Sequence, residues 1–190
     1  MSTLLSVLLG VGLSAACGFR IFVPFLLVGI AARTGHLVLG PSFGWMSSTP
    51  ALVAFCAATV LEVAAYYIPW LDHFLDVIAS PAAVIAGMVM TASVVTGLDP
   101  MMRWTLALIA GGGIAATVQA LSVGTRKLSL VTTGGLGNPI VSTFELAGSI
   151  ALTVLAIAVP LLAFAVIAWA LFFGVRVLLR WLSGPGNAPA

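Results

Sequence analysis

Long apolar runs separated by short polar segments dominate the pattern of this chain. A helix of about 20 apolar residues is long enough to cross the hydrocarbon core of a bilayer. Six runs approach or exceed that length, at residues 4–32, 50–68, 81–98, 104–123, 140–159 and 160–179. The pattern therefore predicts an all-α membrane protein with six transmembrane helices.

The first apolar run is longer than one crossing requires, and it contains an arginine. Residues 4–32 would make a straight helix of about 44 Å at 1.5 Å per residue. Gly18 and Pro24 flank Arg20, and helices commonly bend or stop at such residues. We expect the first helix to be kinked or broken near Gly18–Pro24, with a steep tilt of an unbroken helix as the alternative.

Two polar connections between the runs are long enough to carry structure of their own. Residues 69–76 place Asp72 and Asp76 one helical turn apart and predict a short helix that lies at the membrane interface. Residues 124–139 predict a long polar connection between the fourth and fifth spans, and its moderately apolar middle could re-enter the bilayer.

The two halves of the chain share several weak similarities. A Gly-x-Arg element occurs in each half, as Gly18 to Arg20 and as Gly124 to Arg126. A span that begins with proline and carries a glutamate follows in both halves. Three spans per half force the second half to insert upside down, which predicts two inverted repeats of the kind found in secondary transporters. The predicted units are a single membrane domain over residues 1–182, its repeats at about 4–98 and 102–180, and a disordered tail at 183–190.

Composition agrees with a membrane protein and narrows its partners. Of the 190 residues, 62% are hydrophobic and 6% are charged, whereas soluble domains have about 25% charged residues. The mean hydropathy is +1.23. A net charge of +2 gives no reason to expect nucleic acid as a partner. Both cysteines lie in apolar runs, so a disulfide framework is not expected.

The basic residues predict an orientation in the membrane. In a six-span protein, four of them flank the side that holds both termini, and two flank the opposite side. The first set is Arg126, Lys127, Arg176 and Arg180, and the second set is Arg33 and Arg103. By the positive-inside rule, both termini are predicted to be cytoplasmic. The abundance of Ala, Gly, Val and Leu favours a bacterial inner-membrane protein.

Four charged residues form the candidate solute or ion pathway. Arg20 and Glu62 lie inside apolar runs of the first half, and Glu145 lies early in the fifth span. A charged side chain at membrane depth costs about 2.5–3.5 kcal/mol on insertion scales, so it needs a partner or a wet cavity. We expect Glu62 and Glu145 to be proton or cation sites, with Arg20 and Arg126 as countercharges or anion contacts. There are two alternatives: buried ion pairs that only fix helix register, and an Arg126 that is simply a loop charge beside Lys127.

A glycine-rich segment precedes the fifth span and contains Gly135, Gly137, Asn138 and Pro139. Backbone N–H groups at such a helix start can bind an anion, aided by the helix dipole. The segment lacks the adjoining strand and lysine of a nucleotide-binding loop. An ordinary turn is the alternative interpretation.

The sequence carries no recognisable catalytic motif. It has no His-Glu-x-x-His zinc motif, no nucleophile elbow and only two histidines. Asp72, His73 and Asp76 could ligate a metal ion, but a solvated or capping role at the interface is favoured for them. We therefore expect no enzyme activity, no metal and no cofactor.

Three elements of the sequence occur in an order that is similar to a known family. They are the Gly-x-Arg-x-x-x-Pro opening at 18–24, the run from Glu62 to Pro81 with its Ile-Pro pair, and the segment from Gly134 to Glu145. Together they resemble the uncharacterised bacterial membrane family catalogued as domain of unknown function 4126, over about residues 8–175. Members of that family tend to carry basic residues at two positions where this chain has Tyr67 and Ser80. The resemblance implies the fold and the importance of these residues, but it brings no substrate.

Passage of a small solute or ion is the leading functional hypothesis, with coupling to protons through Glu62 and Glu145. A chain of 19.4 kDa leaves little room for a pathway within one subunit, so we expect a homo-oligomer in the lipid bilayer. The alternatives are a non-transporting membrane scaffold or assembly factor, and a lipid-handling protein. The lipid-handling alternative requires a lateral groove that opens toward the bilayer near Arg20.

Overall fold

The computed structural model describes residues 2–182, apart from the side chains of residues 69–75, 175 and 177–182. The predicted tail at 183–190 therefore lies outside the described residues. In chain order the helices are α1 (Thr3–Phe19), α2 (Phe22–Arg33), α3 (Thr49–Tyr66), α4 (Pro69–Val94), α5 (Pro100–Leu106), α6 (Gly113–Thr133), α7 (Asn138–Ala158) and α8 (Pro160–Leu182). A 3₁₀ segment, η1 (Pro41–Ser47), precedes α3, and a π-helical segment, η2 (Ala107–Gly112), joins α5 to α6. The described residues contain no strand, which confirms the all-α fold class.

Capping side chains and prolines determine where the helices begin. Ser2, Ser48 and Asp99 each accept a hydrogen bond from a backbone N–H in the first turn of the helix that follows. Prolines occupy the first turn of α3, α4, α5 and α7, where their missing N–H leaves no carbonyl unpaired. At the other end of α6, Gly134 adopts the left-handed φ of 63° that ends a helix.

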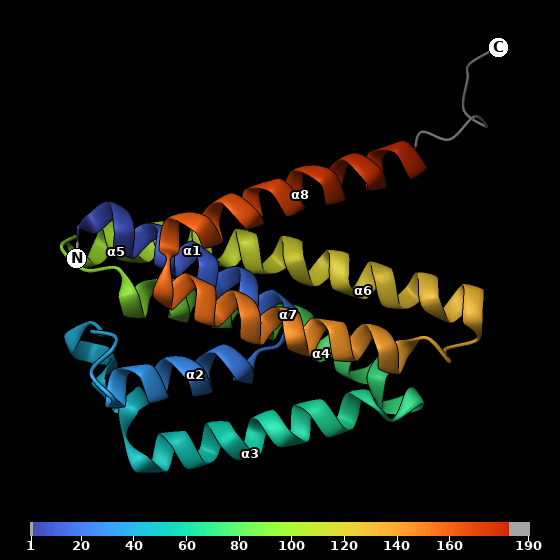
Figure 1. Ribbon diagram of the computed structural model, residues 1–190, viewed down its shortest axis with the longest axis horizontal. Coiled ribbons are helices and arrows are strands. Elements are labelled where there is room, and N and C mark those ends of the chain that lie inside the picture. The colour runs from blue at the N-terminus through green and yellow to red at the C-terminus, as the bar shows by residue number, and fades with distance from the viewer. Residues whose placement is uncertain (1, 183–190) are drawn as a thin grey trace.

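The first helix, α1, lies at the centre of the bundle. Every residue from Leu8 to Gly18 is buried, and α4, α6, α7 and α8 pack against this helix (Figure 1). Glycines permit the close approach. A Cβ added at Gly12 would lie 2.7 Å from the Cβ of Ala156, and one added at Gly18 would lie 2.6 Å from that of Val118. The first apolar segment is therefore apolar because it packs against other helices, and not because it faces lipid.

The first apolar run is broken where the sequence predicts a break. Arg20 has an extended backbone between α1 and α2, with φ −144° and ψ 129°. Pro24 falls in the first turn of α2, where its missing N–H costs nothing. Gly18 is not the breaking residue, because it lies inside α1 and serves close packing.

After the break the chain turns back. Figure 1 shows α2 running toward the end of the bundle at which α1 begins. Neighbouring contacts agree: a Cβ at Gly97, which follows α4, would lie 3.1 Å from Oγ1 of Thr3 at the start of α1. Gly40, which follows α2, donates its N–H to the oxygen of Ser93 near the end of α4, at 2.8 Å. The two helices therefore form a hairpin instead of the single crossing that we expected.

The predicted interfacial helix at 69–76 is not separate from the third span. Both belong to α4, which continues past Pro81 to Val94. A proline inside a helix removes one backbone hydrogen bond. Close by, the hydroxyl of Ser80 donates to the oxygen of Asp76 at 2.7 Å. Asp76 is 8% exposed, so it is buried against other helices and does not have the solvated role that we expected.

The predicted polar connection at 124–139 is mostly helical. α6 continues to Thr133, and only a short turn precedes α7. The Gly-x-Arg repeat makes Gly124, like Gly18, a candidate helix break, but Gly124 lies within α6 with open space around its α-carbon and does not break the helix. The helix continues because its polar residues Ser122 and Arg126, one turn apart, are buried against neighbouring helices.

Six spans and inverted repeats are not confirmed. In the part of the chain that the structure describes, four helices are long and apolar enough to cross a membrane. They are α3, the part of α4 from Asp76 to Val94, the continuous helix over Pro100–Thr133, and α7. The first half begins with a hairpin that reverses at Arg20, whereas the second half begins with a helix that does not reverse.

The ends of the described chain lie at opposite ends of the bundle. α1 begins at one end and α8 finishes at the other (Figure 1). Two cytoplasmic termini are therefore not confirmed. The burial of Arg126, which is 2% exposed, also weakens the charge count behind that prediction, because this residue is not a loop charge.

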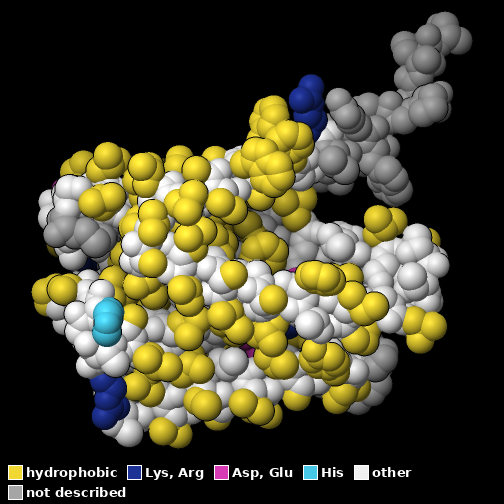
Figure 2. Space-filling model, viewed as in Figure 1, with side chains coloured by type: hydrophobic (Ala, Val, Ile, Leu, Met, Phe, Trp, Pro, Cys, Tyr) yellow, Lys and Arg dark blue, Asp and Glu magenta, His cyan; other side chains and the backbone are white. Residues whose placement is uncertain are grey.

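The outer surface fits a membrane environment. Figure 2 shows a largely apolar face, with most of the visible Lys and Arg surface at its margins. Exposed side chains on this and other faces include Val53 and Leu61 of α3 and Phe144 of α7, at 64%, 70% and 74% exposure. Apolar surface of this extent is typical of contact with lipid.

Cysteine labelling distinguishes the α1–α2 hairpin from a single crossing. Ser2→Cys and His36→Cys should react with a membrane-impermeant maleimide from the same side of oriented vesicles, and Leu136→Cys from the opposite side. The exposed Cys56 would first be replaced by serine, while the buried Cys17 can stay. Labelling of the first two positions from opposite sides would contradict the hairpin.

Glycine packing between α4 and η2 predicts a stability difference. A Cβ at Gly87 would lie 2.6 Å from the Cβ of Ala115 and 2.7 Å from the oxygen of Gly111. Gly87→Leu should therefore lower the free energy of unfolding by about 1–3 kcal/mol, the usual cost of overpacking. The matched control is Gly124→Leu, because that position has open space. Thermal unfolding in detergent measures both, and an equal loss in the two variants would refute the packing argument.

Candidate functional site

Arg20 lies at the joint between α1 and α2, with 1% of its surface exposed. Its Nη2 donates to the backbone oxygen of Ser142 at 3.0 Å and to the hydroxyl of the same residue. The same nitrogen lies 3.4 Å from Oε2 of Glu145. The guanidinium carbon lies 4.0 Å from the ring centroid of Tyr66, which is a cation–π contact. The arginine at the end of α1 is thus held chiefly by α7 and α3.

Glu62 caps the N-terminus of α2. The first N–H groups of any helix lack partners within that helix. The Oε1 atom of Glu62 accepts the N–H of Ile21 at 2.8 Å, and its Oε2 atom accepts the N–H of Phe22 at 3.1 Å. A carboxylate at this end of a helix also interacts favourably with the helix dipole. The break in the first apolar run therefore frees backbone N–H groups, and the carboxylate of Glu62 on α3 binds them.

Arg126 on α6 binds two acids from different helices. Its Nη1 donates to Oδ1 of Asp76, and its Nε donates to Oε1 of Glu145 at 3.1 Å. Its Nη2 lies 3.3 Å from the hydroxyl of Ser122, which in turn donates to Glu145. The guanidinium carbon lies 4.4 Å from the ring centroid of Tyr66. One aromatic ring thus contacts both buried arginines.

These side chains form a single group that we call the charge cluster, defined as Arg20, Glu62, Asp76, Arg126 and Glu145. Its members come from the α1–α2 joint, α3, α4, α6 and α7. Glu62 lies within electrostatic range of both guanidinium groups. Asp76, Arg126 and Glu145 each lie about 10 Å along their helices from the nearer end of the bundle, at 1.5 Å per residue. The cluster is therefore inside the bundle and not at its rim.

The charge cluster contains one more acid than base. Three carboxylates face two guanidinium groups, so the fully ionised cluster has a net charge of −1. Several of its polar atoms also lack hydrogen-bond partners among the described residues, namely Nε and Nη1 of Arg20 and Oε2 of Glu145. A buried charge that is left uncompensated is costly. The arrangement can therefore accommodate an additional proton or a small cation.

The structure brings together the four residues that the sequence assigns to a pathway. Arg20, Glu62, Arg126 and Glu145 all belong to the charge cluster. The alternative in which Arg126 is a solvated loop charge is wrong, because that side chain is buried. The geometry alone is compatible with both a functional cluster and a set of ion pairs that fixes helix register.

Sequence reasoning missed Asp76, Tyr66, Ser122 and Ser142 as members or contacts of this site. A periodic signal exists for Asp76, because the buried positions of α4 follow it at helical spacing, at Ala79, Ala83, Ala86 and Met90. Ser122 and Arg126 are likewise one turn apart on the buried face of α6. The side chain of Asp72 lies outside the described residues.

The glycine-rich segment forms a tight turn between α6 and α7. Gly135 has a φ of 88°, which favours glycine. The N–H of Gly137 donates to Oγ1 of Thr133 at 2.9 Å, and that of Asn138 donates to the oxygen of Gly135 at 3.1 Å. Pro139 occupies the first turn of α7. Because these amides already have partners in the chain, the geometry favours the ordinary turn over an anion loop.

A family model described as "Domain of unknown function (DUF4126)" matches residues 7–180. The chain belongs to this family, as the sequence motifs indicate. No curated protein and no solved structure matches the chain. Among the described residues, no group of three His, Cys, Asp or Glu side chains is placed to hold a metal ion.

Removing one arginine from the charge cluster should destabilise the fold strongly. Arg126→Gln removes the ion pairs of Arg126 with Asp76 and Glu145, and breaking a buried ion pair from one side costs about 3–5 kcal/mol. Lys127→Gln is the matched control, because it removes a neighbouring but exposed positive charge. Unfolding of both variants in detergent should show a large loss for the first and less than about 0.5 kcal/mol for the second. Similar stabilities would contradict the role of Arg126 in holding the helices together.

Proposed function

We propose that this member of the DUF4126 family passes a small ion or solute across a membrane and uses the charge cluster as a proton-linked site. The observation that carries the proposal is a cluster with three carboxylates and two guanidinium groups, all of them buried except the partly buried Glu62. Ionisable groups at membrane depth are rare and usually mark ion pathways or proton relays. The excess acid is the feature that a purely structural network of ion pairs does not require.

In this proposal, the need for electrical neutrality links the binding of a cation at the charge cluster to the protonation of its carboxylates. A net charge of −1 in a low-dielectric interior is unfavourable unless a proton or a monovalent cation neutralises it. A proton on one carboxylate and a cation beside it are then alternative ways to reach neutrality. Such competition is the simplest basis for exchange between a proton and a cationic substrate.

The α1–α2 joint offers a mechanical response to the same event. An ionised Glu62 holds the first two N–H groups of α2 and benefits from the helix dipole. Protonation removes the negative charge and weakens both hydrogen bonds, because charge-assisted bonds are about twice as strong as neutral ones. The neighbouring residue, Arg20, is the extended joint and also contacts Glu145. A change at either carboxylate thus acts on the position of α2.

Several further assignments belong to the same proposal. We place the protein in a bacterial inner membrane as a homo-oligomer, and we assign it no enzymatic reaction. The polar atoms of the charge cluster mainly contact one another, which fits a proton or ion site better than a site for covalent chemistry.

Flux measurements test the proposal directly. Purified protein in proteoliposomes should give a proton- or ion-dependent signal above empty vesicles under an imposed pH gradient. Glu62→Gln should reduce this signal to the level of empty vesicles, because glutamine cannot exchange a proton. Asp99→Asn is the matched control, because Asp99 is exposed outside the charge cluster and asparagine can still cap α5.

Two results would overturn the proposal. The first is a wild-type protein without any signal above empty vesicles, and the second is a Glu62→Gln signal equal to that of the wild type. If Glu62→Gln does not fold, as judged by its elution and melting profile, Glu145→Gln provides the same test from the other half of the chain.

A further inference from the structure

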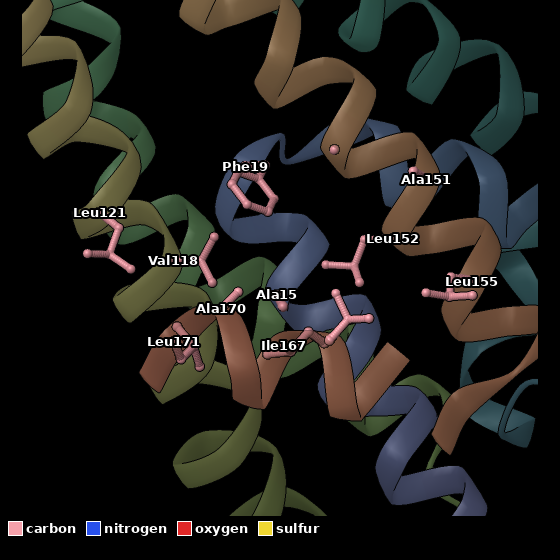
Figure 3. Close-up of a pocket in the computed structure, with 12 residues that line it drawn as sticks. Ala15, Phe19, Val118, Leu121, Ala151, Leu152, Leu155, Ile167, Ala170 and Leu171 are labelled. Carbon is pink, nitrogen blue, oxygen red and sulfur yellow. The ribbon is translucent and has the colours of Figure 1, made fainter. Parts of the chain in front are cut away.

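A small cavity lies between α6 and α7 beside the charge cluster. Its volume is about 220 Å³, and its walls include Ser122, Thr125 and Glu145. The remaining wall residues are apolar, namely Phe19, Leu121, Val141 and Phe144. Figure 3 shows Phe19 and Leu121, which this cavity shares with a larger groove of about 340 Å³ between α1, α6, α7 and α8. Glu145 is thus both a member of the charge cluster and a wall residue of the small cavity.

Polar atoms of both kinds, donors and an acceptor, lack hydrogen-bond partners next to this cavity. Oε2 of Glu145 accepts no hydrogen bond from the described residues, although this residue is only 5% exposed. Nε and Nη1 of Arg20 donate none to the described residues, and Nη2 of the same guanidinium group lies 3.4 Å from Oε2. Buried polar groups without a protein partner are commonly satisfied by ordered water.

The mixture of donors and an acceptor determines which ligand fits best. A cation pairs with Oε2 of Glu145 and leaves the N–H groups of Arg20 unsatisfied, and an anion does the reverse. A water molecule both donates and accepts, so water can satisfy the two residues together. The hydroxyls of Ser122 and Thr125 in the wall add further polar partners. A cavity of this size holds several water molecules, since each takes about 30 Å³ in the liquid.

A row of hydroxyl side chains leads from the cavity to the turn between α6 and α7. Ser122, Thr125, Ser129 and Thr133 follow one another at intervals of three or four residues, so they lie on one face of α6. This face is turned toward the start of α7, because a Cβ added at Gly137 would lie 2.5 Å from Oγ of Ser129 and 3.2 Å from Oγ1 of Thr133. Thr133 is exposed at the end of α6. The row therefore offers water a polar path from that end of the bundle into the cavity.

In the opposite direction along α7, packing closes the polar positions. Ser149 and Thr153 are 0% exposed, and their hydroxyls donate to the backbone oxygens of Ala16 at 3.0 Å and of Ser149 at 2.7 Å. A Cβ added at Gly12 of α1 would lie 2.7 Å from the Cβ of Ala156, which leaves no space between these helices. The larger groove has hydrophobic walls, and apolar cavities stay dry. Within the described residues, the polar path from the cavity thus leads to one end of the bundle.

We propose that water fills the small cavity, binds at Oε2 of Glu145 and at the N–H groups of Arg20, and connects the charge cluster to the aqueous side at the α6–α7 turn. Glu145 is then the carboxylate through which the cluster exchanges protons with that side. The water site stands on its own, whereas its use in proton exchange rests on the proposed function. Transport that is coupled to protons needs such one-sided access, because a site open to both sides at once would leak.

Cysteine accessibility tests whether the cavity holds water. In the Cys56→Ser protein, Thr125→Cys and Leu121→Cys place a thiol in the cavity wall. Gly124→Cys and Ala120→Cys are the matched controls, because these neighbours are exposed on α6 but line neither the cavity nor the groove. A membrane-impermeant cationic methanethiosulfonate reacts with thiolates, which form in water and not in lipid. Each wall position should therefore react at least about tenfold faster than its control.

Closing the path should slow the reaction at the deeper wall position. Thr125→Leu replaces a polar side chain nearer the turn with a larger apolar one, and it should slow the labelling of Leu121→Cys at least about tenfold. Gly124→Leu places its side chain in open space and should leave the rate unchanged. If Thr125→Leu does not fold, Val141→Phe narrows the same cavity from α7. In oriented vesicles, labelling should occur only from the side at which Leu136→Cys reacts.

The outcomes separate the water site from transport. Wall cysteines that do not react, or that react no faster than their controls, would overturn the water site. Labelling from both sides would overturn the one-sided path.

The flux assay tests the use of this path by protons. Thr125→Leu should reduce proton flux in proteoliposomes, and Gly124→Leu should not. An unchanged flux in Thr125→Leu would overturn the role of the path in proton exchange. Fast, one-sided labelling of a protein that shows no flux at all would support the water site and remove the transport proposal instead.

Discussion

The structure depends on the neutralisation of two buried guanidinium groups. Arg20 and Arg126 are 1% and 2% exposed inside a bundle that is otherwise almost entirely apolar. Neither could be buried alone, because an unpaired charge in a low-dielectric interior costs several kcal/mol. Glu145 on α7 contacts both of them, and Tyr66 on α3 lies against both. The positions of α3, α4, α6 and α7 around the α1–α2 joint follow from this requirement.

The charge cluster connects the interior of the bundle to the start of α2 and to a cavity. Glu62 links the charge cluster to the first turn of α2, and Glu145 links it to a small cavity between α6 and α7. Protonation of the charge cluster, the position of α2 and ligand binding would therefore all depend on the net charge of this cluster.

The sequence contained enough information to identify the charged residues and the break. Arg20, Glu62 and Glu145 stand out because their apolar surroundings make an unpaired charge implausible, and Pro24 shows that the helix cannot continue normally. Hydropathy cannot show the direction of α2, because a crossing helix and a returning helix are equally apolar. It also misplaced Asp76 and the residues around Arg126, because polar residues within a buried helix have the composition of a loop. Their burial depends on partners far away in the sequence.

The central position of α1 has a consequence for biosynthesis. This segment leaves the ribosome before α6, α7 and α8, which pack against it. Arg20 can contact Ser142 and Glu145 only after both have been synthesised, because they lie 122 and 125 residues later in the chain. The core of the protein is thus completed only after α6, α7 and α8 have been made. Until then an intramembrane cation must be shielded by water, by lipid head groups or by the insertion machinery.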